Sequence, residues 1–266
     1  MKDPAIEAAY NHCIRITRSH YENFPVASWF IPAHLRRPVS VIYAFARMAD
    51  DIADEGNDDA GARLAGLDKF VSALDSINKD EPQHQPVFIA LADTIHRFRL
   101  PLAPFYDLLA AFRMDVTKNR YKDFNDVLHY CSYSANPVGR LILYLHDRAT
   151  PDNLIRSDAI CTSLQLINFL QDIEQDYVER GRIYLPQCEM QQYGVDEDHI
   201  RQQCTDSAML ALVDRQVMRI LDHIHLRRDD VFSRPRLTKG DWCWMIWMGL
   251  QKHPQPFSLT RLIHPS

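Results

Sequence analysis

Apolar residues recur along this chain mainly every three or four positions, which is the period of an amphipathic α-helix. The first such stretch covers residues 5–20, and its apolar face consists of Ala8, Ala9, Cys13 and Ile16. No strict two-residue alternation of any length occurs, and only 8 of the 266 residues are glycine. The pattern therefore predicts an all-α chain.

Prolines, glycines and capping residues divide the chain into separate predicted helices. These helices cover residues 5–20, 33–55, 62–78, 87–99, 103–118, 125–146, 152–178, 206–230 and 240–251. The helix over 125–146 should break or kink at Asn136 and Pro137, and residues 181–186 should form a loop. Because no repeat, low-complexity tract or linker interrupts the series, we expect a single domain over residues 1–266.

Two acidic clusters, residues 50–54 and 172–176, lie on different predicted helices. With side chains offset by roughly 100° per residue, each cluster continues a polar stripe along one helix face. The stripe on the first helix consists of Tyr43, Arg47, Asp50 and Asp54, with Asp51 at its edge. The stripe on the second helix consists of Gln165, Asn168, Asp172 and Asp176. In one packed domain the two stripes should face each other across a pocket.

Facing carboxylates of this kind predict a magnesium site. Mg²⁺ prefers oxygen ligands and is usually held by a few carboxylates together with substrate phosphates. Acidic stripes alone would repel a diphosphate, whereas a metal between them would bind the diphosphate and stabilise it as a leaving group. One acidic helix end is more often a solvated surface, but two matched stripes favour the metal site. A calcium-binding loop starting at Asp51 is excluded because Ala53 and Ala62 occupy two of its ligand positions.

Composition and charge narrow the classes of function. The formal net charge of −5 gives no basic footprint for nucleic acid. The six cysteines are widely spaced without a Cys-x-x-Cys pair, which is typical of a reduced, cytoplasmic protein. The longest apolar run, residues 242–250, is about half as long as a membrane-spanning helix, so we expect no membrane span. Its aromatic residues are typical of a core or a pocket rim, and peripheral contact with a membrane surface is the alternative.

Three ordered motifs carry a resemblance to a known family. They are Tyr-Ala-Phe-Ala-Arg at 43–47, Gln-Leu-Ile-Asn-Phe-Leu-Gln-Asp at 165–172 and Gly-Arg-Ile-Tyr-Leu-Pro at 181–186. In this order they resemble the squalene/phytoene synthase family over about residues 10–250. The resemblance implies an isoprenoid-synthase-type helical bundle with a central cavity, in which Mg²⁺ on the two acidic helices promotes the departure of diphosphate from a prenyl substrate.

The resemblance also implies roles for individual residues. The metal ligands would be Asp50, Asp54, Asn168 and Asp172, with Asp51 and Asp176 as further ligands or their close neighbours. The residues in contact with diphosphate would be Arg47, Arg182 and Tyr184, since arginine suits bidentate phosphate binding. The cavity would be lined by Tyr43, Phe24 and Gln165. We expect the aspartates and Tyr43 to be the catalytic groups.

The chain departs from the family pattern at positions in the predicted pocket. Family members that condense two allylic diphosphates usually have Ser-x-Ser-Phe where this chain has Tyr-Glu-Asn-Phe at 21–24. The usual Tyr-x-Val-Ala-Gly-x-Val-Gly segment is Ser-Tyr-Ser-Ala-Asn-Pro-Val-Gly at 132–139, and the arginine expected before Asp172 is Gln171. A second diphosphate therefore lacks two of its usual hydroxyl contacts.

Residues 22–28, 134–140 and 168–172 instead resemble the hydroxysqualene synthase branch of bacterial hopanoid and squalene biosynthesis. That resemblance implies a carbon–oxygen lyase that takes preformed presqualene diphosphate, releases diphosphate and quenches the rearranged cation with water. It also implies functional coupling to other enzymes of the squalene pathway. No nicotinamide-binding Gly-x-Gly-x-x-Gly motif is present, so water is the expected terminator. The polar residues that could hold this water are Asn23, Ser132, Ser134 and Asn136.

Two alternatives stay open. The first is a conventional squalene or phytoene synthase, a transferase that joins two allylic diphosphates head to head, which the missing serines and Gln171 disfavour. The second is a non-catalytic assembly factor of the same fold, which would not need both acidic motifs, although both are intact here. The prenyl chain length, the stereochemistry of water addition and the oligomeric state are not encoded in any motif that we identify.

Overall fold

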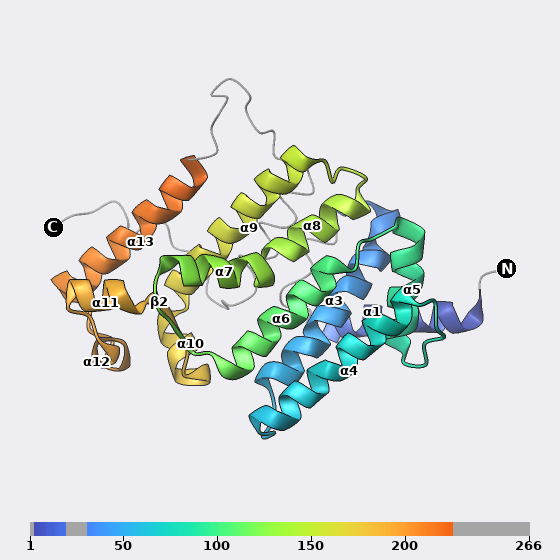
Figure 1. Ribbon diagram of the computed structural model, residues 1–266, viewed down its shortest axis with the longest axis horizontal. Helices are drawn as coiled ribbons and strands as arrows, with labels where there is room; N and C mark the ends of the chain where they lie inside the picture. The colour runs from blue at the N-terminus through green and yellow to red at the C-terminus, as the bar shows by residue number, and fades with distance from the viewer. Residues whose placement is uncertain (1–2, 20–30, 226–266) are drawn as a thin grey trace.

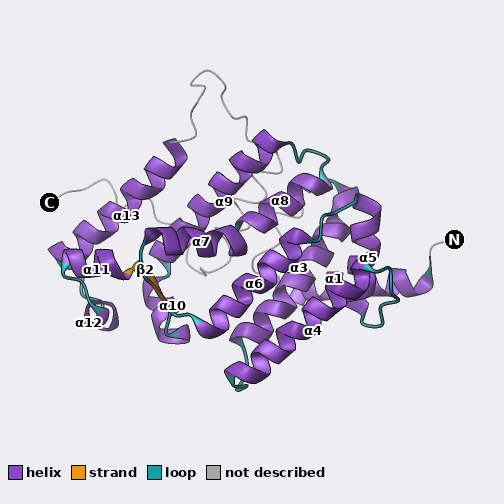
Figure 2. Cartoon of the chain, in the orientation of Figure 1, coloured by secondary structure: helices purple, strands orange, loops and turns teal. Residues whose placement is uncertain are grey.

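The computed structural model describes residues 3–19 and 31–225, and nearly all regular structure in these ranges is helical (Figures 1 and 2). The helices before residue 118 are α1 (Pro4–Ser19), α3 (Ala33–Asp54), α4 (Ala60–Asn78), α5 (Pro86–Phe98) and α6 (Ala103–Thr117). Their starts carry ordinary helix signals, since Pro86 and Pro104 lie in first turns and the side chain of Asp59 accepts a hydrogen bond from the backbone of Ala62. Each agrees with a predicted helix to within a few residues.

The second part of the described chain contains more elements than the sequence predicts. They are β1 (Arg120–Tyr121), α7 (Phe124–Ser134), α8 (Asn136–Leu145), α9 (Pro151–Gln171), α10 (Ile173–Arg180), β2 (Ile183–Pro186), α11 (Gln187–Tyr193), α12 (Glu197–Arg201) and α13 (Ser207–His225). The predicted break before Pro137 is confirmed, because α7 ends at Ser134 and α8 begins at Asn136. The helix predicted over 240–251 lies outside the described residues.

Two predictions of secondary structure are wrong, and two short helices were not predicted. The helix over 152–178 is two helices that meet at Asp172, whose backbone (φ −106°, ψ 16°) leaves the helical range. Aspartate favours such a junction because its short side chain competes for nearby backbone groups. The loop over 181–186 is strand β2, which pairs in parallel with β1, and α11 and α12 were not predicted. Two strands this short show no alternation, and their pairing joins distant parts of the sequence.

Helix α3 lies at the centre of the larger core, in contact with α1, α4, α5 and α6 (Figure 1). The ring of Phe45 packs edge-on against Phe105, with centroids 5.4 Å apart, and tilts against Phe70 at 5.5 Å. Fully burying one such side chain stabilises the fold by roughly 1.5–3 kcal/mol. This packing fixes α3 along its apolar face and leaves the acidic residues near its C-terminal end free to face other elements.

Helices α8 and α9 approach closely at Gly139. A Cβ atom at this position would lie 2.3 Å from Ser157 Oγ and 2.4 Å from Cys161 Sγ, so a larger residue would push the two helices apart. The approach places Asn136, one turn earlier on α8, against α9, where its Oδ1 accepts a hydrogen bond of 2.9 Å from Thr162 Oγ1. Among the described helices, none is long and apolar enough to cross a membrane.

Candidate active site

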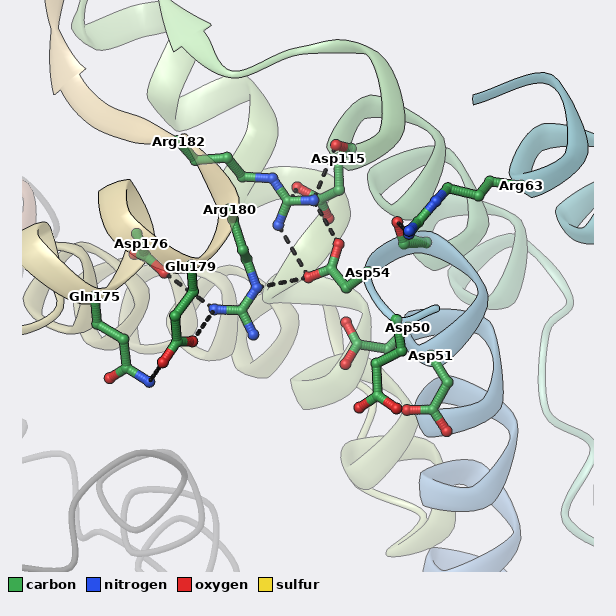
Figure 3. A network of polar contacts seen from close by, with 12 residues as sticks. Asp50, Asp51, Asp54, Arg63, Asp115, Gln175, Asp176, Glu179, Arg180 and Arg182 are labelled. Carbon is green, nitrogen blue, oxygen red and sulfur yellow. Dashed lines mark hydrogen bonds and ion pairs between the residues drawn. The ribbon is translucent and has the colours of Figure 1, made fainter. Parts of the chain in front are cut away.

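The structure brings the two acidic clusters together at one place (Figure 3). Asp54, in the last turn of α3, accepts a hydrogen bond of 2.9 Å from Nε of Arg180, the last residue of α10. Nη1 of the same arginine lies 3.6 Å from Oδ1 of Asp176 in the second cluster. Asp54 and Arg180 are 126 residues apart in the sequence, so the contact is a product of the fold. Asp54 and Asp176, one from each predicted stripe, therefore contact the same guanidinium.

Arg182 makes the second link to Asp54. Its Nη1 donates to Oδ2 at 3.0 Å and its Nη2 donates to Oδ1, an arrangement in which both guanidinium arms hold one carboxylate. Nη2 also donates to the backbone oxygen of Asp115 at 2.9 Å. Gly181, with φ +64°, ends α10 in the left-handed region that favours glycine and turns the chain into β2. The turn aims Arg182 back at α3, and its predicted contact with diphosphate stays a prediction.

The two arginines decide the charge state of Asp54. Burial would raise the pKa of this carboxyl, but the hydrogen bonds and charges of Arg182 and Arg180 outweigh burial and lower the pKa below its ordinary value. Asp50, one turn earlier on α3, behaves in the opposite way. The surrounding protein and the negative charge of Asp54 raise the pKa of Asp50 to about 6, although 39% of its side chain is exposed. At Asp50, burial and the charge of Asp54 therefore outweigh the opposing charges of Arg47 and Arg180.

Asp115 is a site residue that the sequence analysis missed. It lies near the end of α6 with 7% of its side chain exposed, and it accepts a hydrogen bond of 2.8 Å from the hydroxyl of Tyr130 on α7. Its Oδ1 is 3.8 Å from Nη1 of Arg182. Burial, against the opposing effects of Arg182 and Tyr130, raises the pKa of Asp115 to about 7. The one available signal was an acidic residue between Met114 and Val116 on a mostly apolar helix.

The pKa of Asp115 predicts a pH-dependent stability in metal-free protein. Because the folded pKa of about 7 exceeds the ordinary value of 3.8, the folded state holds a proton that the unfolded state releases between about pH 4 and pH 7. The free energy of unfolding should therefore fall as pH rises through this window, by roughly 1–4 kcal/mol. Asp115→Asn should flatten that slope in urea denaturation with EDTA, whereas an unchanged slope would contradict the raised pKa.

Arg47 and Tyr43 lie on α3 before the acidic cluster, as predicted. Nε of Arg47 lies 2.7 Å from Oδ1 of Asp51, and its Nη1 is 3.5 Å from Asp50 and its Nη2 pairs with Glu55. Tyr43 is half-buried one turn earlier, where burial raises the pKa of its hydroxyl. Arg47 therefore neutralises part of the negative charge of the first cluster from within its own helix. Its guanidinium is also close enough to these carboxylates for one bound molecule to contact both.

The second cluster is more buried than the first. Asp172 forms the junction between α9 and α10, Asp176 lies one turn later on α10, and both residues are only 4% exposed. The backbone nitrogen of Asp176 donates to the oxygen of Asp172 at 2.8 Å, so the chain keeps a helical path across the junction. Asn168 and Gln165 are half-buried on α9, one and two turns before Asp172. The predicted stripe thus survives the break in the helix.

Tyr184, predicted to contact diphosphate, lies in a cluster of aromatic rings. Its ring stacks on Phe169 with centroids 3.8 Å apart and an angle of 5°, and on Tyr121 with centroids 5.2 Å apart. Tyr130 packs against Tyr184 at 5.5 Å and joins this cluster to Asp115. The ring of Tyr184 is therefore held rigidly two residues after Arg182, and its contact with diphosphate stays a prediction.

The residues proposed to hold water are placed in different surroundings. Asn136 is buried and bonded to Thr162, and the hydroxyl oxygen of Ser134 is buried without a hydrogen-bond partner in the described part of the chain. Ser132 is exposed and donates to the backbone of His129, which makes it a poor candidate. Asn23 and Phe24 lie outside the described residues. Asn136 and Ser134 therefore stay the candidates among the described residues.

The acidic side chains fit a magnesium ion that arrives with a diphosphate. Within residues 3–19 and 31–225, no three His, Cys, Asp or Glu side chains form a group that could hold a metal ion by themselves. Mg²⁺ usually takes only one or two carboxylates and completes its shell with substrate phosphates and water. Asp50 offers a partly exposed carboxylate whose pKa burial and the charge of Asp54 raise. The donor chemistry therefore suits Mg²⁺, although Asp54 and Asp176 already pair with arginines, Asp54 with Arg180 and Arg182 and Asp176 with Arg180.

Comparison with known proteins agrees with the ordered motifs. A family model described as squalene/phytoene synthase matches residues 17–246. The hydroxysqualene synthase of Rhodopseudomonas palustris is 41% identical over 189 residues, which cover 71% of this chain and 63% of that protein. The chain spans 55 to 63% of the lengths of three curated hydroxysqualene synthases that it matches, so their activity does not by itself establish the activity of this protein.

Solved structures show the same fold. The structure described as squalene synthase HpnC from Alicyclobacillus acidocaldarius superposes with a TM-score of 0.79 and 36% identity, covering 92% of this chain and 91% of the other. A dehydrosqualene synthase in complex with ligand gives a TM-score of 0.72 and 27% identity over 82% of this chain and 75% of the other. The predicted isoprenoid-synthase-type helical fold is confirmed. The chain belongs to the squalene/phytoene synthase family.

Proposed function

We propose that this protein is a hydroxysqualene synthase, which ionises presqualene diphosphate with Mg²⁺ and captures the rearranged cation with water. One observation supports the proposal most strongly. Arg180 joins Asp54 of the first acidic cluster to Asp176 of the second, beside the buried guanidinium of Arg182. A metal–diphosphate complex needs both kinds of group, because carboxylates bind the metal and arginines bind the diphosphate. The identity to hydroxysqualene synthases supports the choice of substrate.

Different residues would act on the diphosphate and on the prenyl part of the substrate. Asp50, Asp54, Asn168 and Asp172 would hold Mg²⁺, with Asp51 and Asp176 close by. The metal would supply Lewis-acid stabilisation of the departing diphosphate. Arg182 and Arg47 would bind diphosphate oxygens, and Tyr43 would line the path of the departing group. The stacked rings of Tyr184 and Phe169 offer π faces that attract a carbocation and exclude bulk water.

Water capture needs a polar group inside an otherwise apolar pocket. Asn136 supplies one, because the hydrogen bond from Thr162 engages its carbonyl oxygen and leaves the amide nitrogen as a donor. A bound water needs two to four such partners. Asn136 at the usual glycine position of the family segment therefore adds a hydrogen-bonding group that a glycine side chain cannot provide.

A head-to-head condensing synthase is the second candidate, favoured by the likeness to a dehydrosqualene synthase. The two hypotheses differ in the number of diphosphates bound. We expect the purified protein with Mg²⁺ to turn over presqualene diphosphate at least about tenfold faster than farnesyl diphosphate, because Tyr21 and Asn23 replace two phosphate-binding hydroxyls. Separate incubations with each substrate and identification of the lipid products by mass spectrometry test this. Efficient formation of presqualene diphosphate from farnesyl diphosphate would favour the condensing enzyme.

A further inference from the structure

Arg180 lies between the two acidic clusters, where the proposed function requires a metal (Figure 3). Its Nε donates to Asp54 of the first cluster, and its Nη1 reaches Asp176 of the second at 3.6 Å and Glu179 at 3.5 Å. The carboxylate side chains of Asp54 and Asp176 are 11% and 5% exposed, so these charges are largely removed from water. Buried carboxylates of like sign repel each other strongly unless a cation lies between them. In this structure the cation is the guanidinium of Arg180.

The neighbouring Arg182 is held in a different way. Its side chain is 8% exposed, both of its arms bind Asp54, and one arm also donates to the backbone oxygen of Asp115. The side chain of Arg180 is 29% exposed, and each hydrogen bond and ion pair that it makes among the described residues is to a carboxylate. Arg180 is the last residue of α10, and Gly181 follows it. Arg182 is therefore anchored to the fold, whereas Arg180 can rotate towards solvent without breaking any bond to the backbone.

A divalent cation and Arg180 compete for the same oxygens. A metal ion bound to Asp54 and to the second cluster would repel a guanidinium a few ångströms away, and it would need the Asp54 oxygen that Arg180 occupies. A diphosphate beside the metal would in turn attract the displaced guanidinium. Both changes favour one rearrangement, in which Arg180 leaves the carboxylates and turns to the diphosphate.

We infer that Arg180 is an internal counter-cation, which joins the two acidic clusters in the metal-free protein and suppresses metal binding until a diphosphate arrives with the metal. The inference rests on the proposed function, because it assumes that the clusters hold a divalent ion. It goes beyond that function by assigning Arg180 the coupling between metal binding and diphosphate binding. The protein would then bind little metal alone and would bind metal and diphosphate together.

The test compares Arg180→Gln with the unmodified protein. Mn²⁺ serves as the probe, and its free concentration is read by electron paramagnetic resonance with and without inorganic pyrophosphate. We expect Arg180→Gln to bind Mn²⁺ alone about fivefold more tightly, which corresponds to the loss of one partly exposed ion pair. Arg113→Gln is the matched control, since it removes the same charge from α6 but breaks only a surface pair with Asp68, and it should change Mn²⁺ binding by less than about twofold.

Thermal unfolding provides a readout that a merely structural role would not give. In EDTA, Arg180→Gln should melt a few degrees below the unmodified protein, because the acidic clusters repel. Added Mn²⁺ should restore most of this loss in the variant and shift the unmodified protein little. A melting loss that Mn²⁺ does not restore, together with unchanged Mn²⁺ affinity, would overturn the inference. Should the variant fail to fold, Arg180→Lys takes its place, with the same direction and a smaller gain expected because one ammonium spans the two carboxylates less well.

The pyrophosphate arm separates this inference from the proposed function. If the unmodified protein binds Mn²⁺ with pyrophosphate and Arg180→Gln gains no affinity for Mn²⁺ alone, the role of Arg180 is wrong and the proposed function stands. If the unmodified protein binds no Mn²⁺ even with pyrophosphate, the metal-dependent function itself is wrong, and the inference falls with it.

Discussion

Asp50→Asn and Asp172→Asn should each reduce the release of diphosphate by about a thousandfold or more. Asparagine keeps an oxygen ligand but removes the negative charge that holds a hard divalent cation. At Asp50 the loss cannot be attributed to unfolding. Because its pKa is raised by burial and by Asp54, the ionised carboxylate weakens the metal-free fold, and the asparagine variant should be at least as stable.

Diphosphate release can be followed with a coupled phosphate assay on presqualene diphosphate, and folding by circular dichroism and thermal melting. Asp68→Asn is a suitable control, since this exposed residue forms a surface ion pair with Arg113 and the variant should retain full activity. Turnover like that of the unmodified protein in the Asp50 or Asp172 variant would remove these residues from the metal site. Treatment with EDTA should likewise stop the reaction in the unmodified protein.

The part of the site on α3 followed from the sequence because it depends on local geometry. A single uninterrupted helix fixes the relative directions of Tyr43, Arg47, Asp50 and Asp54 from their spacing. Helical spacing also predicted that the second stripe extends to Asp176, although the helix is interrupted at Asp172. It succeeded there because the hydrogen bond from Asp176 to Asp172 preserves the helical turn.

The parts that the sequence did not predict depend on contacts between distant segments. Asp115 becomes a site residue only when the turn between α10 and β2 brings Arg182 to α6, 67 residues earlier in the chain. Arg180 lies at a helix C-terminus, where a basic residue is common, so its position in the sequence did not indicate a special role. Its partner Asp54 is 126 residues away, and neither helical period nor motif spacing encodes that distance. Pairing of β1 with β2 was missed for the same reason.

Asn136→Leu should change the product more than the rate of ionisation. Leucine has the same number of side-chain heavy atoms but cannot hydrogen-bond water, so the cation should lose a proton and the main product should shift from the alcohol to eliminated hydrocarbons. Thr162→Val removes only the hydrogen bond that orients Asn136, and it should shift the product in the same direction to a smaller degree. The product ratio is measured by gas chromatography with mass spectrometry.

One control and two contradicting outcomes complete the test of Asn136. Ser132→Ala is the control, since this exposed hydroxyl bonds the backbone of its own helix and should leave the product unchanged. An Asn136→Leu variant that folds, releases diphosphate and still makes only the alcohol would show that another group holds the water. A variant that loses diphosphate release altogether would place Asn136 at the metal site and contradict its assignment to the end of the reaction.

The central claim is that this chain ionises one preformed diphosphate and ends the reaction with water. The most direct test is a single incubation of the purified protein with presqualene diphosphate and Mg²⁺ in H₂¹⁸O, with and without NADPH, followed by mass spectrometry of the lipid products. We expect a C30 alcohol that carries the ¹⁸O label and a product that NADPH does not alter. A hydrocarbon that requires NADPH, or an alcohol without the label, would show that the reaction does not end with water.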